Sequence, residues 1–356
     1  ASRLSSSAPS PPLLADLPSL EVELQFNAGT HDAQLHDAPV GETVRVYDGR
    51  PQPHRFTLDG CGFQLVEAPA YDHAALDLYE QPEAVVAQLY PQVEALLLKH
   101  MPGARRVLLF DHLLRNPKRM AAELEEAAAA RGKEDPSGKT ILQPRTRFLE
   151  MPLGHIHGDY TVRSGVTRAR QLLAPYATAA QIDAALSSRF AIVNVWHSFG
   201  PQPVAADPLA LCVWGSFSPR DVRTKRLTFP HRVGETYQAL HSPSQQWVHF
   251  SSARRDEAIL LKTFDSATDG RARFALHGAF RTPQQAAGAA LPTRESIELR
   301  ALVLFADGAE AIAPRFVNPS MAAADAPPLA REQARLTELE LYNLIESALL
   351  PASDEW

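Results

Sequence analysis

The sequence predicts a mainly β protein with flanking helices, in which antiparallel strands form a barrel or a sandwich. Short apolar runs of strand character follow one another in the second half of the chain, at residues 190–196, 209–214, 246–250, 258–264, 274–277 and 297–305. A βαβ fold would alternate strands with helices instead. The chain contains neither a G-x-G-x-x-G nor a Walker-type loop, which excludes the common nucleotide-binding folds.

The first half of the chain adds further strands and helices. Polar–apolar alternation predicts four strands, the second and third joined as a hairpin by a turn rich in Gly and Pro, at residues 21–26, 43–47, 55–58 and 63–66. An apolar run predicts another strand at 106–110. Apolar stripes with helical spacing predict a helix at 82–100, kinked or divided at Pro91, and a second helix at 166–187.

These elements predict a single catalytic domain over residues 21–305, preceded by a flexible polar leader at 1–20. Residues 114–146 combine a helix-prone stretch with a polar loop. We expect an insert or a lid there, although a spacer explains the composition equally well. A Pro- and Ala-rich linker at 306–328 leads to a C-terminal helix at 329–350, which we expect to pack on the core.

Charge and composition limit the partners of the chain. Its 356 residues include 35 Lys and Arg against 41 Asp and Glu, so the net charge is -6 and nucleic acid is not an expected partner. Two cysteines, Cys61 and Cys212, lie in separate apolar segments and are expected to be buried free thiols. No apolar run reaches the roughly 18 residues that a membrane span needs, and no signal peptide is evident. We expect a cytoplasmic protein that acts on a small molecule, with a homodimer as an option.

A candidate metal site begins in the segment His155–Thr161. His157 and Asp159 are separated by one residue, and a strand would direct both side chains to the same side. With His277 from a second strand across a barrel mouth, they would form the 2-His-1-carboxylate triad of non-haem Fe(II) oxygenases. Ordinary polar residues in a barrel core are the alternative explanation. A zinc hydrolase with the same ligands is a further one.

A candidate anion site follows the last of these ligands. Arg294 and Ser296, again one residue apart, could hold the carboxylate of an acid co-substrate, because guanidinium binds carboxylates bidentately and a hydroxyl adds one donor. Arg281 and Arg300 compete for this role. Arg281 would share the strand face of His277, whereas Arg300 lies three pleats beyond Arg294.

The ordered motifs resemble a known family when they are read together. They are H-G-D-Y-T at 157–161, N-V-W at 194–196, and the segments 247–250, 256–266, 277–280 and 294–300. The chain resembles microbial secondary-metabolism non-haem iron oxidoreductases, which include the cephamycin methoxylation accessory component, fungal hydroxylase/desaturases, the gibberellin desaturase and aziridine-forming amino-acid oxygenases. The resemblance covers roughly residues 20–305. It implies a double-stranded β-helix (cupin-like jelly roll), Fe(II), 2-oxoglutarate and O2.

Six more residues are candidates for the pocket wall or for support of the ligands, namely His155, Tyr160, Asn194, Trp196, His197 and Lys262. Many members of the family have Arg at the position of His197, so this residue points to a different substrate or binding mode. Lys262 lies in an apolar strand and is expected to pair with Asp265 or Glu298, or to line the site, because an unpaired buried ammonium is costly.

The predicted function is oxidation of an unactivated C–H bond by an Fe(II)/2-oxoglutarate-dependent dioxygenase, giving hydroxylation, desaturation or ring closure. Basic residues are expected to be sparse around the pocket. We therefore expect a small apolar substrate with one polar handle, such as an amino acid or a terpenoid acid, whose carboxylate could meet His197 and Arg281. A non-catalytic accessory subunit of a partner enzyme is the alternative.

Overall fold

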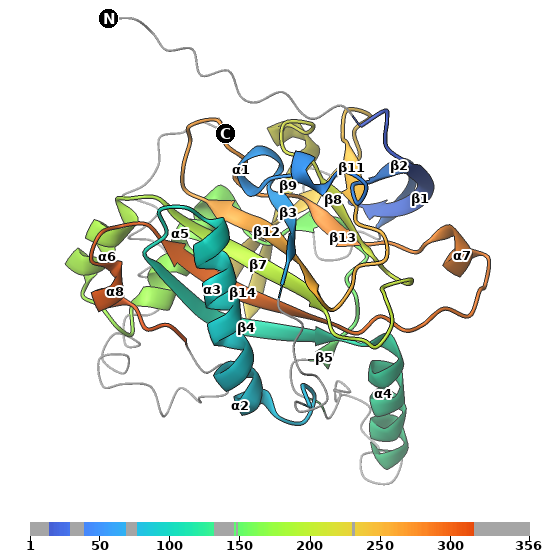
Figure 1. Cartoon of the computed structure of the whole chain (residues 1–356), viewed down its shortest axis with the longest axis horizontal. Helices are drawn as coiled ribbons and strands as arrows, with labels where there is room; N and C mark the ends of the chain where they lie inside the picture. The colour runs from blue at the N-terminus through green and yellow to red at the C-terminus, as the bar shows by residue number, and fades with distance from the viewer. Residues whose placement is uncertain are drawn as a thin grey trace, which may run out of the picture.

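The computed structural model describes residues 14–28, 39–68, 77–131, 146, 149–229 and 232–316. These residues form two β-sheets with helices around them, which agrees with the predicted fold class (Figure 1). The first sheet has eight strands in the order β1 (Ser19–Phe26), β2 (Val40–Asp48), β11 (Trp247–His249), β8 (Leu209–Cys212), β13 (His277–Ala279), β6 (His157–Gly158), β10 (Arg232–Ala239) and β9 (Val222–Phe229).

The second sheet has six strands in the order β3 (Phe63–Glu67), β12 (Glu257–Asp265), β7 (Phe190–Ser198), β14 (Ser296–Leu304), β4 (Arg106–Arg115) and β5 (Leu149–Glu150). All neighbouring strands are antiparallel except the pairs β2–β11 and β4–β5. Leu211 and Val248 of the first sheet share one apolar cluster with Trp196 and Leu261 of the second. The two sheets therefore pack face to face, as in a jelly roll.

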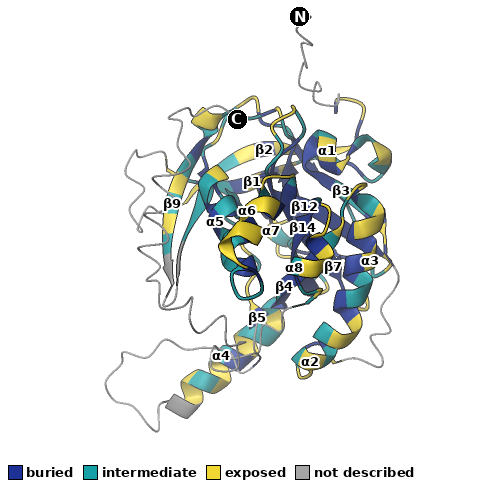
Figure 2. Cartoon of the chain, turned by 90° about the vertical axis from the view of Figure 1, so that its left-hand side faces the viewer, coloured by how far each residue is buried: buried dark blue, intermediate teal, exposed yellow. Residues whose placement is uncertain are grey.

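Short helices join and cover the sheets. They are α1 (Leu58–Cys61), α2 (Pro82–Ala84), α3 (Tyr90–His100), α4 (Pro117–Arg131), α5 (Val162–Leu173), α6 (Ala179–Leu186), α7 (Pro283–Ala286) and α8 (Ala309–Ile312), with 3₁₀ turns at Pro53–Arg55 and Pro219–Asp221 and a π-helical turn at Val85–Leu89. Figure 2 shows that the central strands are buried, whereas α4 carries many exposed residues and extends away from the body.

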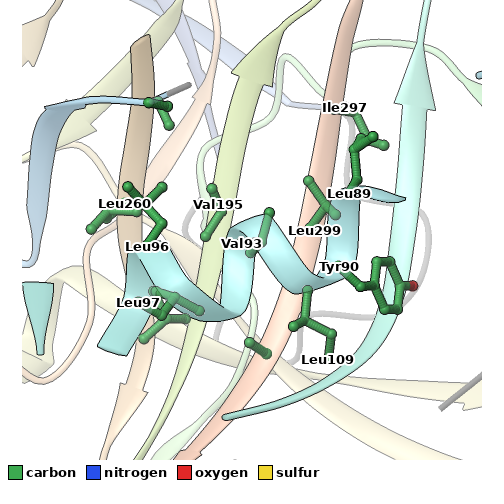
Figure 3. Close-up of a cluster of buried hydrophobic side chains, with 14 of the residues drawn as sticks. Leu89, Tyr90, Val93, Leu96, Leu97, Leu109, Val195, Leu260, Ile297 and Leu299 are labelled. Atoms are coloured by element: carbon green, nitrogen blue, oxygen red, sulfur yellow. The ribbon is translucent and has the colours of Figure 1, made fainter. Parts of the chain in front are cut away.

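The outer face of the six-stranded sheet packs against α3 (Figure 3). Alternate residues of the central strands point toward this helix because side chains in a strand repeat every two residues. Val195 of β7 and Leu299 of β14 are fully buried beneath Val93 and Leu97 of α3. The intervening residues of the same strands face the first sheet, where they border the site described below.

Several predicted elements are revised by the structure. The helix expected at 82–100 is interrupted by a π-helical turn just before Pro91, which has no N–H to continue the helical ladder. The helix expected at 166–187 is two helices, because Pro175 interrupts it and Thr178 caps α6 through a capping box. Residues 55–58 form no strand, and β2 pairs with β1 and β11 instead.

Other predictions are only partly covered by the described residues. Residues 117–131 of the expected insert form α4, whereas 132–145 lie outside the described residues. The same holds for most of the expected leader and linker and for the whole C-terminal helix at 329–350. The hairpin of β9 and β10 was not predicted, because Val222–Phe229 is rich in charged residues, which edge strands tolerate. Both cysteines are buried and free, as predicted.

Candidate metal centre

Two histidines and one aspartate converge on the inner side of the eight-stranded sheet. His157 on β6 lies directly opposite His277 on the adjacent strand β13, and not across a barrel mouth. Asp159 follows β6 in a bend, outside the strand that was expected to place it. Its Oδ1 atom lies 3.2 Å from Nε2 of His157 and 3.8 Å from Nε2 of His277. One ligand atom from each residue lies within 4.8 Å of the others, so a single ion could meet all three.

Backbone hydrogen bonds orient both imidazoles. Nδ1 of His157 lies 2.8 Å from the carbonyl oxygen of His155, and Nδ1 of His277 lies 3.1 Å from that of Ala275. A carbonyl oxygen only accepts, so each Nδ1 carries the proton and donates it. Nε2 of each ring is therefore directed toward Asp159. Burial lowers the pKa of His157, but the hydrogen bond that its Nε2 donates to Asp159 and the charge of that carboxylate outweigh this and leave the pKa raised; a metal ion would take the place of this proton. Metal-binding histidines are held in this way, with the remote nitrogen fixing the tautomer.

The carboxylate of Asp159 is held in its ionised form. Burial opposes ionisation, but the hydrogen bond from His157, the charge of that imidazole and the charge of Arg300 outweigh this opposition, so the pKa of Asp159 lies well below its usual value. Its second oxygen, Oδ2, accepts a hydrogen bond of 2.7 Å from Nδ2 of Asn194 on β7. Burial lowers the pKa of His277, which favours the neutral form that a metal requires. The donor set fits a divalent ion of the non-haem iron type.

The three residues border a cavity of about 470 Å³ between the sheets, α5 and β10. Its wall is strongly charged. Carboxylates come from Asp111, Glu150, Asp159, Glu235 and Glu298, and guanidinium groups come from Arg115, Arg163, Arg168, Arg294 and Arg300. The expectation that basic residues would be sparse around the pocket was therefore wrong. The alternation of Ser296, Glu298 and Arg300 within an otherwise apolar strand was a signal for this charged face.

Arg294 borders this cavity, and Ser296 contacts Arg294 from the adjoining strand β14. Nε of Arg294 donates to Oγ of Ser296 over 2.9 Å, and a second guanidinium nitrogen, Nη1, donates to the carbonyl oxygen of Asp207 over 2.5 Å. The guanidinium carbon lies 5.3 Å from the ring centre of Trp196, which stands behind it in the core. Among the described residues Arg294 forms no ion pair, although only 3% of it is exposed.

Arg281 and His197 lie away from the cavity. β13 ends at Ala279, so Arg281 does not continue the strand face of His277; it is exposed and donates to the carbonyl oxygen of Gln285. His197 is buried on the opposite face of β7 from Asn194, and its Nδ1 lies 2.7 Å from the carbonyl oxygen of Glu257. Neither borders the cavity, so the proposed meeting of a substrate carboxylate with these two residues loses its basis.

The remaining candidates have separate roles. Tyr160 lines the cavity and also packs against an apolar cluster beneath α5. Lys262 is fully buried and forms ion pairs with Asp265 over 2.7 Å and with Asp59 over 2.6 Å. The pairing with Asp265 was one of the predicted alternatives. It does not border the cavity. The backbone carbonyl of His155, and not its imidazole, supports the metal site.

Relatives of known classification agree with this geometry. Residues 16–304 match a family model described as "Oxidoreductase/YMDC permease-like domain". The chain belongs to this oxidoreductase family. The hydroxylase/desaturase efuI of Hormonema carpetanum is 29% identical to the chain over 279 residues, which covers 75% of this chain and 84% of that protein. The Fe(II)/2-oxoglutarate-dependent dioxygenase nvfI of Aspergillus novofumigatus is 28% identical and covers 73% and 82%.

A solved structure shows that the fold of this oxidoreductase is also similar to that of a known enzyme. The iron and alpha-ketoglutarate-dependent endoperoxidase NvfI superposes with a TM-score of 0.61 at 25% identity, covering 80% of this chain and 97% of that one. The predicted family, the oxidoreductase class and the double-stranded β-helix fold are therefore confirmed. No helix among the described residues has the length and apolar character needed to cross a membrane.

Proposed function

We propose that this chain is an Fe(II)/2-oxoglutarate-dependent oxygenase that oxidises an unactivated C–H bond of a small secondary-metabolism substrate. Hydroxylation, desaturation and oxidative ring closure all begin with the breaking of such a C–H bond. The cofactors Fe(II), 2-oxoglutarate and O2 agree with the names of the relatives. The observation that carries the proposal is the pairing of a facial donor set with a buried guanidinium that lacks a counter-ion.

His157, Asp159 and His277 would hold the iron. Both Nε2 atoms and one carboxylate oxygen converge, and the remaining polar atom of each side chain is engaged by Asn194 or by a backbone carbonyl. Three protein ligands on one side leave the other positions of a six-coordinate ion to small molecules. When bound, the ion would supply the activation of O2 that C–H oxidation needs.

Arg294 would anchor 2-oxoglutarate. Burial and the nearby charge of Arg115 lower its pKa to about 9, and the charges of Asp207 and Glu298 offset this only in part. A buried guanidinium without a counter-ion is costly, and a carboxylate at this point would remove that cost. Ser296 accepts from Nε of Arg294, which leaves its own hydroxyl proton to donate to the same ligand. Arg300 is less suited, because Asp111 and Glu298 already pair with it at 3.1 and 3.0 Å.

The decisive test combines metal binding with turnover. Anaerobically purified protein should bind about one equivalent of Fe(II) and release succinate from 2-oxoglutarate once O2 is admitted. His157→Ala should lose both properties, because a facial site with two remaining ligands binds iron weakly. His155→Ala is the matched control, since it removes a neighbouring imidazole but keeps the backbone carbonyl that orients His157. Iron binding by the His157 variant at wild-type affinity would show that the ligands are wrong.

The alternative, a non-catalytic accessory subunit, predicts a different result in the same assay. Such a protein could bind iron but would release no succinate without its partner. The zinc hydrolase is less favoured, because a water-activating zinc site gives Arg294 no ligand to bind. Cytoplasmic location and a homodimer stay predictions, as does the choice of an amino acid as substrate.

A further inference from the structure

We infer that the substrate carries a carboxylate and that Arg168 on α5 binds it, at the opposite end of the cavity from Arg294. This inference rests on the proposed function, because it assigns the second anion site to the molecule that is oxidised. Arg168 borders the cavity, and neither Arg281 nor His197 does.

Arg168 has no ion-pair partner among the described residues. Its guanidinium carbon lies 5.1 Å from the ring centre of Phe110 on β4, and its buried Nε atom has no hydrogen-bond partner. No described carboxylate pairs with it. By contrast, Arg115 pairs with Glu150 at 3.0 Å, and Arg300 pairs with two carboxylates. Arg168 and Arg294 are thus cavity-lining guanidinium groups that pair with no carboxylate among the described residues.

The position of Arg168 is fixed by the way α5 packs against strands β10 and β12. Thr161 and Ser164 form a capping box at the start of the helix, and the hydroxyl of Ser164 also donates to the backbone carbonyl of Glu235 on β10 over 2.7 Å. Gly165 lies so close to Phe264 that an added Cβ would meet the ring at 2.2 Å. This close approach holds the helix against β12 and directs the next residues, Thr167, Arg168 and Gln171, to the cavity.

The register of β14 and β4 separates the two cations. Ser296, which contacts Arg294, pairs with Arg115, whereas Arg300 pairs with Asp111 beside Phe110. Phe110 and Arg115 are five residues apart, or about 16 Å along a strand. Arg168 lies over Phe110, so the two guanidinium groups stand at opposite ends of this stretch. One small dicarboxylate near Asp159 cannot occupy both, and 2-oxoglutarate at Arg294 leaves Arg168 to another anion.

A carboxylate suits the Arg168 end better than a larger anion. The cavity of about 470 Å³ must hold both small molecules, and guanidinium matches the two oxygens of a carboxylate. Gln171, one turn further along α5, also lines the cavity. Its side-chain amide makes no hydrogen bond within the described residues and can donate one to the substrate carboxylate. The substrate is therefore a small acid whose carboxylate points toward α5 and whose oxidised carbon lies near the triad.

The test uses the full chain loaded anaerobically with Fe(II) and 2-oxoglutarate. The visible charge-transfer band of this complex reports ligands that enter the cavity, without any turnover. The probes are small aliphatic acids and α-amino acids, each compared with its own methyl ester. Wild-type protein is compared with Arg168→Gln, with Arg168→Lys, and with Arg170→Gln as a control. Arg170 is on the same helix but pairs with Asp183 at 2.6 Å and lies outside the cavity.

We expect at least one acid to perturb the band while its ester does not. Arg168→Gln should weaken the Kd of that acid about ten- to a hundredfold, the usual effect of losing a charged hydrogen bond, with Arg168→Lys intermediate and Arg170→Gln unchanged. Equal binding of acids and esters, unchanged binding by Arg168→Gln, or no perturbation by any acid would overturn the inference. Failure of the wild-type protein to form the band at all would instead remove the proposed function.

Discussion

The two faces of the six-stranded sheet differ completely in character, although the same strands build both. Val195 and Leu299 point to the outer face and pack beneath α3 (Figure 3). One residue away, Asn194 and Glu298 point inward, where Asn194 holds Asp159 and Glu298 pairs with Arg300 at 3.0 Å. The outer face is apolar, and the inner face is polar near the triad.

This difference shows how the fold separates stability from chemistry. Burial of the outer face stabilises the sheet by about 25 cal/mol for each Å² of apolar surface. That rigid support allows the inner face to carry charges that are costly to bury. Substitutions on the two faces should therefore have separable effects, on stability outside and on ligand binding inside.

The largest effect is expected at the centre of the inner site. Asp159→Ala removes the only carboxylate of the triad and should abolish both metal binding and turnover, whereas Glu298→Gln keeps the three ligands and should still bind iron. Metal content after anaerobic loading checks both variants. Thermal unfolding of the metal-free Asp159 variant should stay cooperative. If the Asp159 variant retained iron, the inner face would not be the metal site.

The outer face is best tested on α3. Leu97 is fully buried against the sheet, whereas its neighbour Leu98 is 39% exposed. Leu97→Ala should lower the free energy of unfolding by about 2–5 kcal/mol, because it removes buried methyl groups and leaves a cavity. Leu98→Ala should change it by less than about 0.5 kcal/mol. Chemical denaturation measures both, and similar losses for the two variants would contradict the packing of α3.

A neighbouring pair on β7 compares the two faces directly. Asn194→Ala removes the hydrogen bond to Oδ2 of Asp159 and should weaken metal affinity about 10- to 100-fold, the usual range for a residue that orients a ligand. Val195→Ala should lower stability and leave metal affinity unchanged. Asn194→Asp should not rescue binding, because a second carboxylate repels the first. Titration with Co(II) as a spectroscopic probe would measure these affinities, and equal affinity in Asn194→Ala would exclude the orienting role.

The smallest effect on stability is expected at Glu257, the first residue of β12. Burial raises the pKa of Glu257, but hydrogen bonds from Arg50 and from the backbone of Arg254 outweigh this and leave its pKa lowered. Its contribution to stability is therefore present above the unfolded pKa of about 4.3 and is lost as the pH falls through the folded value. Glu257→Gln should cost about 1–2 kcal/mol at neutral pH. The difference from wild type should shrink below about pH 4; a constant difference would contradict the ion pair.

Sequence patterns predicted most of the strands and all three proposed ligands, because local periodicity and donor chemistry are written in neighbouring residues. β7, β12 and β14 were recognised from apolar runs, with their ends shifted by one or two residues. The hairpin at 43–58 and the continuous helix at 166–187 were wrong, because turn and capping interactions override periodicity there. Arg281 was misjudged because β13 ends at Ala279, two residues earlier. His197 was misjudged although it stands three residues after Asn194 in one regular strand, where alternation directs the two side chains to opposite faces.

By itself the sequence indicated the fold family and predicted the proposed donor set, since His157, Asp159 and His277 are metal-ligand types and their order resembles that of the family. Only the tertiary structure decided which cations remain uncompensated. Arg115, Arg168, Arg294 and Arg300 look alike in sequence, yet two of them meet carboxylates from distant strands and two do not. Charge pairing depends on distances of a few ångströms between segments far apart in the chain, and those distances exist only once the sheets have packed.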